Sequence, residues 1–138
     1  MDRRLEIERI AREHGLLAVY LFGSRADDGL RFLVEGEVEK KESDLDVGVV
    51  FRRFPPEVES SMQLAEDLGE LFDPFRVDYV RLQNTDSIFQ FRALSGHRIA
   101  APDSTAADNY ELDTMRMAAE LLPIQRAREL EALGFTTT

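Results

Sequence analysis

The sequence predicts an α/β (α+β) fold, in which helices pack on a small mixed β-sheet of three to five strands. Short apolar runs that suit buried strands occur at 16–22, 45–51 and 75–82. Segments with the apolar spacing of helices separate these runs, and residues 103–134 are typical of a C-terminal helical region. With 138 residues in all, we expect a single domain over 1–138.

The first half of the chain predicts a helix, a strand and a short helical turn. Asp2 can cap the first helix and Gly15 can end it, so that the strand at 16–22 follows directly. The mixed segment 30–42 comes after the turn. Its centre at Gly36 is expected to be the tip of a hairpin or a loose loop.

The second half predicts a helix opened by Pro55–Pro56, a strand, a short helix capped by Asp86, and a last strand near 97–101. Pro123 is expected to kink or restart the terminal helix. The side chains expected on the buried faces of the two longer helices are Val58, Met62, Ala65, Leu68 and Phe72, and Tyr110, Thr114, Met117 and Leu121.

Composition excludes several classes of function. The chain is 43 % hydrophobic and 32 % charged, which is a globular balance. No apolar run approaches the roughly 20 residues of a membrane span, and the N-terminus lacks the apolar core of a signal peptide, so we expect a cytoplasmic protein without membrane contact. The absence of cysteine excludes a thiolate metal site. A net charge of −10 opposes direct binding to nucleic acid.

A glycine and a serine, Gly23 and Ser24, follow the first buried strand. Glycine lets the backbone approach a ligand closely, and a helix that began at Ser24 would direct its free N–H groups toward an anion. The serine hydroxyl adds one more donor. The pair therefore indicates a phosphate site, although an ordinary capped turn has the same sequence.

Two aspartates, Asp44 and Asp46, lead into the second strand. Alternation along a strand puts them on one face, about 7 Å apart. Such hard oxygen ligands suit Mg²⁺ together with substrate phosphates. The alternative is an acidic, solvated start of a strand.

A third aspartate, Asp78, lies inside the apolar segment 75–82. A buried carboxylate without a partner is costly, so either an arginine such as Arg76 or Arg81 or a metal ion is expected beside it. A structural ion pair is the competing interpretation.

The order of these three signals resembles the nucleotidyltransferase superfamily, which has the DNA polymerase beta-like fold. Within it, the segments 21–26 and 43–47 are similar to the minimal nucleotidyltransferase (MNT) family, often the antitoxin component of HEPN–MNT toxin–antitoxin systems. The resemblance runs from about Leu5 to Leu122. It implies that Gly23 and Ser24, with Arg25, bind nucleotide phosphates.

The resemblance also implies that Asp44, Asp46 and Asp78 are the catalytic, metal-binding carboxylates, with Mg²⁺ as cofactor. The implied reaction transfers AMP from ATP to a hydroxyl of a HEPN-type RNase toxin, in the antitoxin branch a tyrosine, and so silences it. A hetero-oligomer with that toxin is expected. The alternatives are an antitoxin that acts only by binding, or a transferase for a small molecule.

The chain departs from the family pattern in two places. Between Ser24 and Asp44 lie 19 residues (43 − 24), which is more than the family usually has. Asp27 and Asp28 stand where the family often has Arg-Gly. Both departures concern the surroundings of the phosphates and therefore the rate and the choice of nucleotide, more than the fold.

Overall fold

The computed structural model describes residues 2–38 and 43–134 and confirms the predicted mixed α/β fold. Its four-stranded sheet has the order β3-β2-β1-β4, with β1 antiparallel to both neighbours and β2 parallel to β3. The elements are α1 (Arg3–Glu13), β1 (Leu16–Phe22), α2 (Ala26–Glu35), β2 (Leu45–Phe51), α3 (Val58–Leu71), β3 (Val77–Arg81), a 3₁₀ turn η1 (Leu82–Asn84), α4 (Ser87–Leu94), β4 (His97–Ala100) and α5 (Ser104–Ala132).

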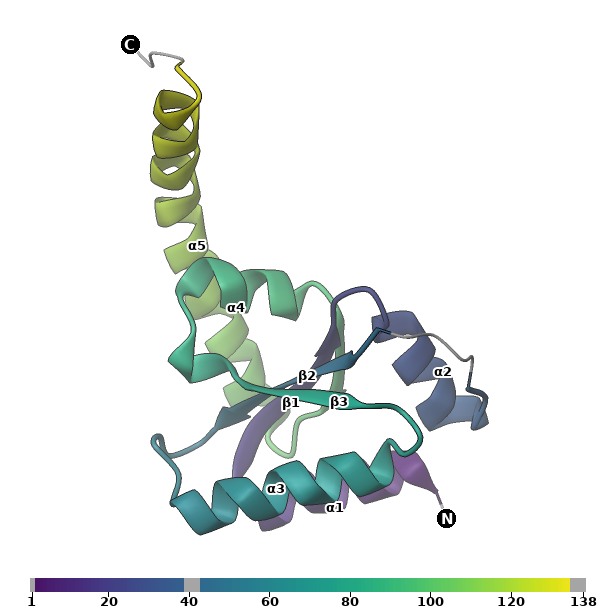
Figure 1. Ribbon diagram of the computed structural model, residues 1–138. Helices are drawn as coiled ribbons and strands as arrows, with labels where there is room; N and C mark the ends of the chain where they lie inside the picture. Colours follow the sequence, from purple (N-terminus) through teal and green to yellow (C-terminus); the bar gives the residue numbers. More distant parts are fainter. Residues whose placement is uncertain (1, 39–42, 135–138) are drawn as a thin grey trace.

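Helices cover both faces of the sheet (Figure 1). Alternate side chains of β1 and β2, such as Leu21 and Val47, pack in one core with α1, α2 and α3. The intervening side chains, such as Tyr20 and Val50, pack in a second core with α4 and α5. Because both faces are buried, β1 and β2 have the continuous apolar sequences from which the strands were predicted.

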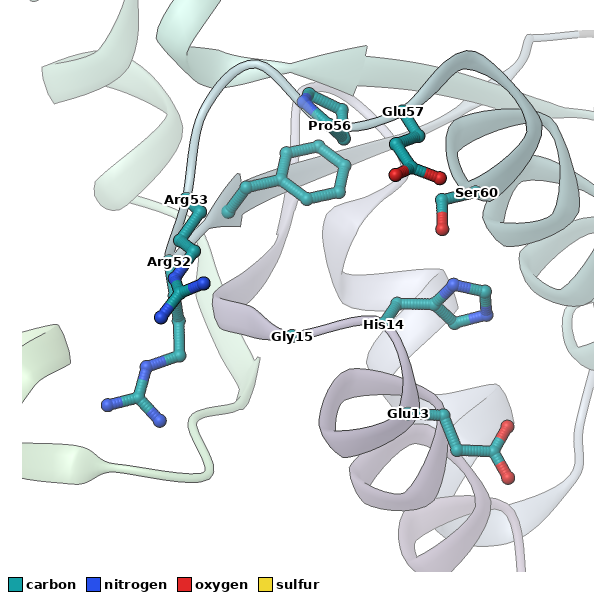
Figure 2. Close-up of a pocket in the computed structure, with 9 residues that line it drawn as sticks. Glu13, His14, Gly15, Arg52, Arg53, Pro56, Glu57 and Ser60 are labelled. Carbon is teal, nitrogen blue, oxygen red and sulfur yellow. The ribbon is translucent and has the colours of Figure 1, made fainter.

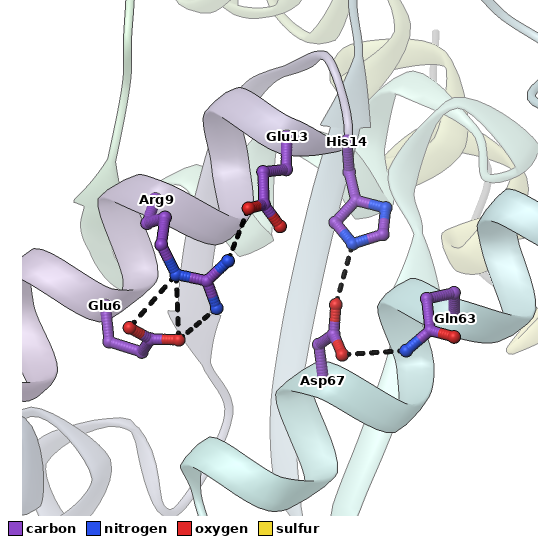
Figure 3. Close-up of polar contacts among 6 residues, drawn as sticks. All are labelled: Glu6, Arg9, Glu13, His14, Gln63 and Asp67. Atoms are coloured by element: carbon purple, nitrogen blue, oxygen red, sulfur yellow. Dashed lines mark hydrogen bonds and ion pairs between the residues drawn. The ribbon is translucent and has the colours of Figure 1, made fainter.

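A polar network joins α1 to α3 at the edge of the larger core (Figure 3). His14 Nε2 and Gln63 Nε2 lie 2.8 and 2.9 Å from the two carboxylate oxygens of Asp67. Burial by itself would raise the pKa of Asp67, but the bonds from His14 and Gln63 outweigh it and lower that pKa. On the same side of α1, Arg9 forms ion pairs with Glu6 and Glu13.

Of the two alternatives for the segment around Gly36, the hairpin is wrong, whereas a loop does begin at Gly36 and includes residues 36–38. α2 continues to Glu35, and Gly36 ends it with the left-handed backbone angle φ of 75°. The helix is retained because Phe32 reaches the core, where its ring lies 5.4 Å from that of Phe75 and 6.3 Å from that of Phe72. Of the 19 residues between Ser24 and Asp44, the 10 residues of α2 are helix.

The buried faces of two helices differ in part from the prediction. Val58 and Met62 are 75 % and 69 % exposed, because α3 turns Leu64, Leu68 and Leu71 toward the sheet instead. On α5, Thr114 is buried as expected but Met117 is exposed.

α5 continues through Pro123 without interruption, so the expected restart of the helix is wrong. Its last turns extend away from the body of the protein (Figure 1). Among the described residues, no helix is both long and apolar enough to cross a bilayer.

Two glycines provide an opposed pair of stability predictions. A Cβ at Gly96 would overlap the backbone carbonyl oxygen of Leu21, whereas a Cβ at Gly69, inside α3, would meet no atom within 4 Å. We expect Gly96→Ala to lower the free energy of unfolding by about 1–3 kcal/mol through overpacking. We expect Gly69→Ala to raise it by about 0.5–1 kcal/mol, because alanine favours the helix. Urea unfolding followed by circular dichroism measures both, and a Gly96→Ala protein as stable as the parent would contradict the packing described.

Candidate active site

The residues predicted for the site converge at one edge of the sheet. β1 ends where β2 begins, because the two strands are antiparallel, and β3 begins beside the start of β2, because that pair is parallel. Phe22 is therefore opposite Asp46, and Asp46 is opposite Asp78. Three segments far apart in sequence thus bring Gly23, Asp46 and Asp78 to the same place.

Asp46 and Asp78 form a pair of like charges. The pKa of Asp46 is raised, first by burial and then by its hydrogen bond with Asp78 and the negative charges of Asp78 and Asp44. Within residues 2–38 and 43–134, no basic side chain lowers the pKa of Asp46. Two adjacent carboxylates in this state favour a bound proton or a cation between them.

Asp78 itself is exposed, contrary to the expectation of a buried carboxylate inside an apolar strand. β3 lies at the edge of the sheet, so this face of the strand reaches solvent. Within the described residues, neither Arg76 nor Arg81 forms an ion pair with Asp78. The structural ion pair that was the alternative role for Asp78 is therefore not present there.

Gly23 is required by the carboxylate beside it. Its backbone angle φ is 76°, and a Cβ at this position would overlap Oδ2 of Asp46. Any other residue would be strained and would displace the Asp46 carboxylate. The glycine therefore fixes the position of one predicted ligand, in addition to the backbone approach expected from the sequence.

Ser24 lies exposed in the turn that leads into α2. The helix begins at Ala26, two residues after Ser24. Among the described residues no side chain caps this N-terminus, and its first N–H group, that of Ala26, donates to the backbone oxygen of Gly23 at 3.3 Å. An anion site between this end of α2 and the Ser24 hydroxyl stays a prediction.

The acidic residues at the start of α2 are each close to a basic side chain. Asp27 Oδ1 lies 2.6 Å from Nε2 of His97, and Asp28 Oδ2 accepts a hydrogen bond of 3.3 Å from Arg25. The sequence did not predict the Asp27–His97 pair, since 70 residues separate the two. The departure from the family's Arg-Gly is thus partly offset by these neighbours.

The Arg25 side chain points into the protein, where it is 4 % exposed. It donates to the backbone oxygen of Ser43 at 3.3 Å, and its guanidinium lies over the ring of Phe75, 4.5 Å from the centroid. Arg25 thereby holds the segment that carries Asp44. The predicted contact between Arg25 and a phosphate stays a prediction.

Asp44 is engaged by an arginine that the sequence associated with Asp78. Arg76 Nε donates to Asp44 Oδ1 at 2.7 Å. The register of the two strands explains this contact. Because β2 and β3 are parallel with Leu45 opposite Val77, Asp44 lies next to Arg76. As they lie, no three His, Cys, Asp or Glu side chains among the described residues form a ready metal site.

The donors nevertheless fit a divalent cation. Asp46 and Asp78 supply hard carboxylate oxygens that are next to one another, which are the ligands that Mg²⁺ prefers. Asp44 could add a third carboxylate in exchange for Arg76. The Mg²⁺ site itself stays a prediction.

A hollow of about 610 Å³ lies at the opposite ends of β1 and β2 (Figure 2). Arg52 and Arg53 lie on one side of it and His14 and Glu57 on the other. Strands of seven residues place it about 20 Å from the aspartates. None of the predicted site residues lines it.

Comparison with known proteins identifies the family of the chain. The sequence matches the family described as "Polymerase beta, Nucleotidyltransferase" over residues 6–105. No curated protein matches significantly.

Solved structures share the fold. A toxin–antitoxin structure with AMP-PNP has a TM-score of 0.67 at 19 % identity, covering 94 % of this chain and 98 % of that one. The structure of a tri-AMPylated Shewanella oneidensis HEPN toxin with its MNT antitoxin has a TM-score of 0.65 at 17 % identity, covering 95 % and 96 %. A putative minimal nucleotidyltransferase has a TM-score of 0.51 at 26 % identity, covering 68 % and 85 %.

The like-charged pair predicts an unusual pH dependence. Because the pKa of Asp46 is raised in the folded protein, its contribution to stability is complete below the ordinary value of 3.8 and is lost as the pH rises through the raised pKa. The Asp46→Asn substitution removes the charge that causes this loss of stability at high pH, and the new amide group can donate a hydrogen bond to Asp78. We expect the variant to be more stable than the parent at about pH 7, with the difference shrinking toward about pH 4.

Urea unfolding at several pH values measures this difference, and Glu66→Gln on the exposed side of α3 is the charge-matched control. If the difference in free energy of unfolding between Asp46→Asn and the parent does not change with pH, the pKa of Asp46 is not raised in the folded protein.

Proposed function

The chain belongs to the polymerase beta nucleotidyltransferase family, and we propose that it is an antitoxin of the HEPN–MNT kind. In this proposal it transfers AMP from ATP to a tyrosine hydroxyl of a HEPN-type RNase toxin. The observation that carries the proposal is the meeting of Gly23–Ser24, Asp46 and Asp78 at one sheet edge. A phosphate site and a carboxylate cluster side by side are what phosphoryl transfer needs.

In the proposed reaction, the triphosphate lies against the Ser24 hydroxyl and the N-terminal end of α2, where the helix dipole is positive. The acceptor oxygen attacks the α-phosphorus, a new P–O bond forms, and the bond to the β-phosphate breaks to release pyrophosphate. Asp78 is exposed and can accept the proton of the attacking hydroxyl. Asp44, Asp46 and Asp78 would hold Mg²⁺, which supplies positive charge against the phosphates.

Support for the nucleotide and for the partner comes from the structural neighbours. One was solved with AMP-PNP, and another contains an AMPylated HEPN toxin bound to its MNT antitoxin. Our extension of both features to this chain rests on the shared fold and on the carboxylate cluster.

Inhibition by binding alone is the second candidate. Two observations favour it: Asp44 is occupied by Arg76, and large apolar side chains are exposed along α5, including Leu112, Met115 and Ile124. In that case the toxin would be silenced in a complex without covalent change.

Ser24→Ala should weaken binding of AMP-PNP in the presence of Mg²⁺ by about tenfold, because one hydrogen bond to a charged phosphate is lost. Calorimetric titration measures the affinity. Ser60→Ala, in the hollow at the opposite end of the strands, is the matched control and should bind as the parent does. Equal affinity of the parent and Ser24→Ala would return Ser24 to an ordinary turn residue.

Asp78→Asn should fold and should still bind a HEPN-type toxin that the parent chain binds, but should transfer AMP at least about 10²-fold more slowly, because the proton acceptor is lost. Mass spectrometry of the toxin after incubation with ATP and Mg²⁺ follows the added AMP. Glu66→Gln is again the control of equal charge change.

Transfer by Asp78→Asn at the parent's rate would remove Asp78 from the mechanism. No added mass with the parent, while the toxin is silenced in a stable complex, would instead favour inhibition by binding.

A further inference from the structure

We propose that Arg76 is a positioning residue that holds Asp44 in the metal-free protein and gives this carboxylate up to a divalent cation. The inference rests on the proposed function, because that function makes Asp44 a metal ligand. The segment that carries Asp78 would then have a second role, because Arg76, directly before β3, would control whether Asp44 is available to the metal.

The geometry of the ion pair comes from the backbone. Leu45 N–H donates to the backbone oxygen of Arg76 at 2.9 Å, which fixes residue 76 next to the start of β2. The guanidinium then reaches Asp44 across the strands at 2.7 Å. The register of β2 and β3 therefore places Asp44 and Arg76 side by side.

The charges of the cluster are unevenly distributed. Among the described residues, Asp46 and Asp78 have no cationic partner and lie beside each other, whereas Asp44 has the Arg76 guanidinium. Three carboxylates and one guanidinium carry a formal charge of −2, which one divalent cation would neutralise. A cation drawn to Asp46 and Asp78 would thus compete directly with Arg76 for Asp44.

The ion pair is weak enough to be exchanged. The side chains of Arg76 and Asp44 are 78 % and 45 % exposed, and solvent-exposed pairs of this kind are typically worth about 0.2–1 kcal/mol. A divalent ion carries twice the charge of the guanidinium and can be shared by several carboxylates. Arg76 therefore keeps Asp44 in place at little cost to the affinity for metal.

The test is Mn²⁺ binding, measured without nucleotide or toxin from the electron paramagnetic resonance signal of the free ion. Arg76→Gln should bind Mn²⁺ about 2–5-fold more tightly than the parent, which corresponds to the strength of an exposed pair. Arg76→Lys keeps a cation and should stay near the parent. Arg81→Gln removes one positive charge from the same strand and should also stay near the parent.

A double-mutant cycle separates release of Asp44 from simple loss of repulsion. In an Asp44→Asn background, Arg76→Gln should have clearly less effect on Mn²⁺ affinity than in the parent. In NMR spectra, the Nε–H resonance of Arg76 should shift when Mg²⁺ is added to the parent.

The proposal would be overturned if Arg76→Gln bound Mn²⁺ no more tightly than the parent. It would also be overturned if Arg76→Gln raised the Mn²⁺ affinity equally in the Asp44→Asn background. Because no transfer is measured, the outcome is independent of the AMP-transfer experiment. A parent that binds Mn²⁺ and responds to Arg76→Gln, yet transfers no AMP, would retain the exchange and refute the proposed reaction.

Discussion

One buried guanidinium joins the three segments on which the site depends. Arg25 follows the Gly-Ser turn, bonds to Asp28 at the start of α2, donates to the carbonyl of Ser43 and covers the ring of Phe75. These contacts connect the end of β1, the approach to β2 and the approach to β3. A buried cation needs partners on every side, so these contacts are mutually dependent, and the spacing of the aspartates depends on them.

The carboxylate cluster lowers the stability of the fold that holds it, because like charges are brought together there. Asp46 is half-buried beside Asp78 and against Gly23, where neither solvent nor a cation fully compensates its charge. Titratable groups with shifted pKa values are frequent at functional sites. A bound ligand or cation there can relieve the repulsion that destabilises the free protein. The surrounding apolar strands provide the rigidity that keeps the two carboxylates together.

The sequence was sufficient for the strands and for the order of the site residues, and much less so for the contacts between them. Continuous apolar runs delimited β1 and β2 because both faces of each strand are buried. The Arg76–Asp44 pair required the register of β2 and β3, and the inward position of Arg25 required Phe75. The continuation of α2 beyond the predicted helical turn was missed because Phe32 packs against aromatic rings that are distant in sequence. The exposure of Met62 was missed because α3 turns a different face toward the sheet.

The long helix at the C-terminal end has a consequence for the lifetime of the molecule. α5 is about 43 Å long, and its last turns extend beyond the body of the protein. There the helix is supported mainly by its own hydrogen bonds, with Ile124 and Leu133 exposed, so local unfolding costs little free energy. Cellular proteases cut chains at such segments. A binding partner that covered this helix would protect it, and the steady amount of intact protein would then follow the amount of that partner.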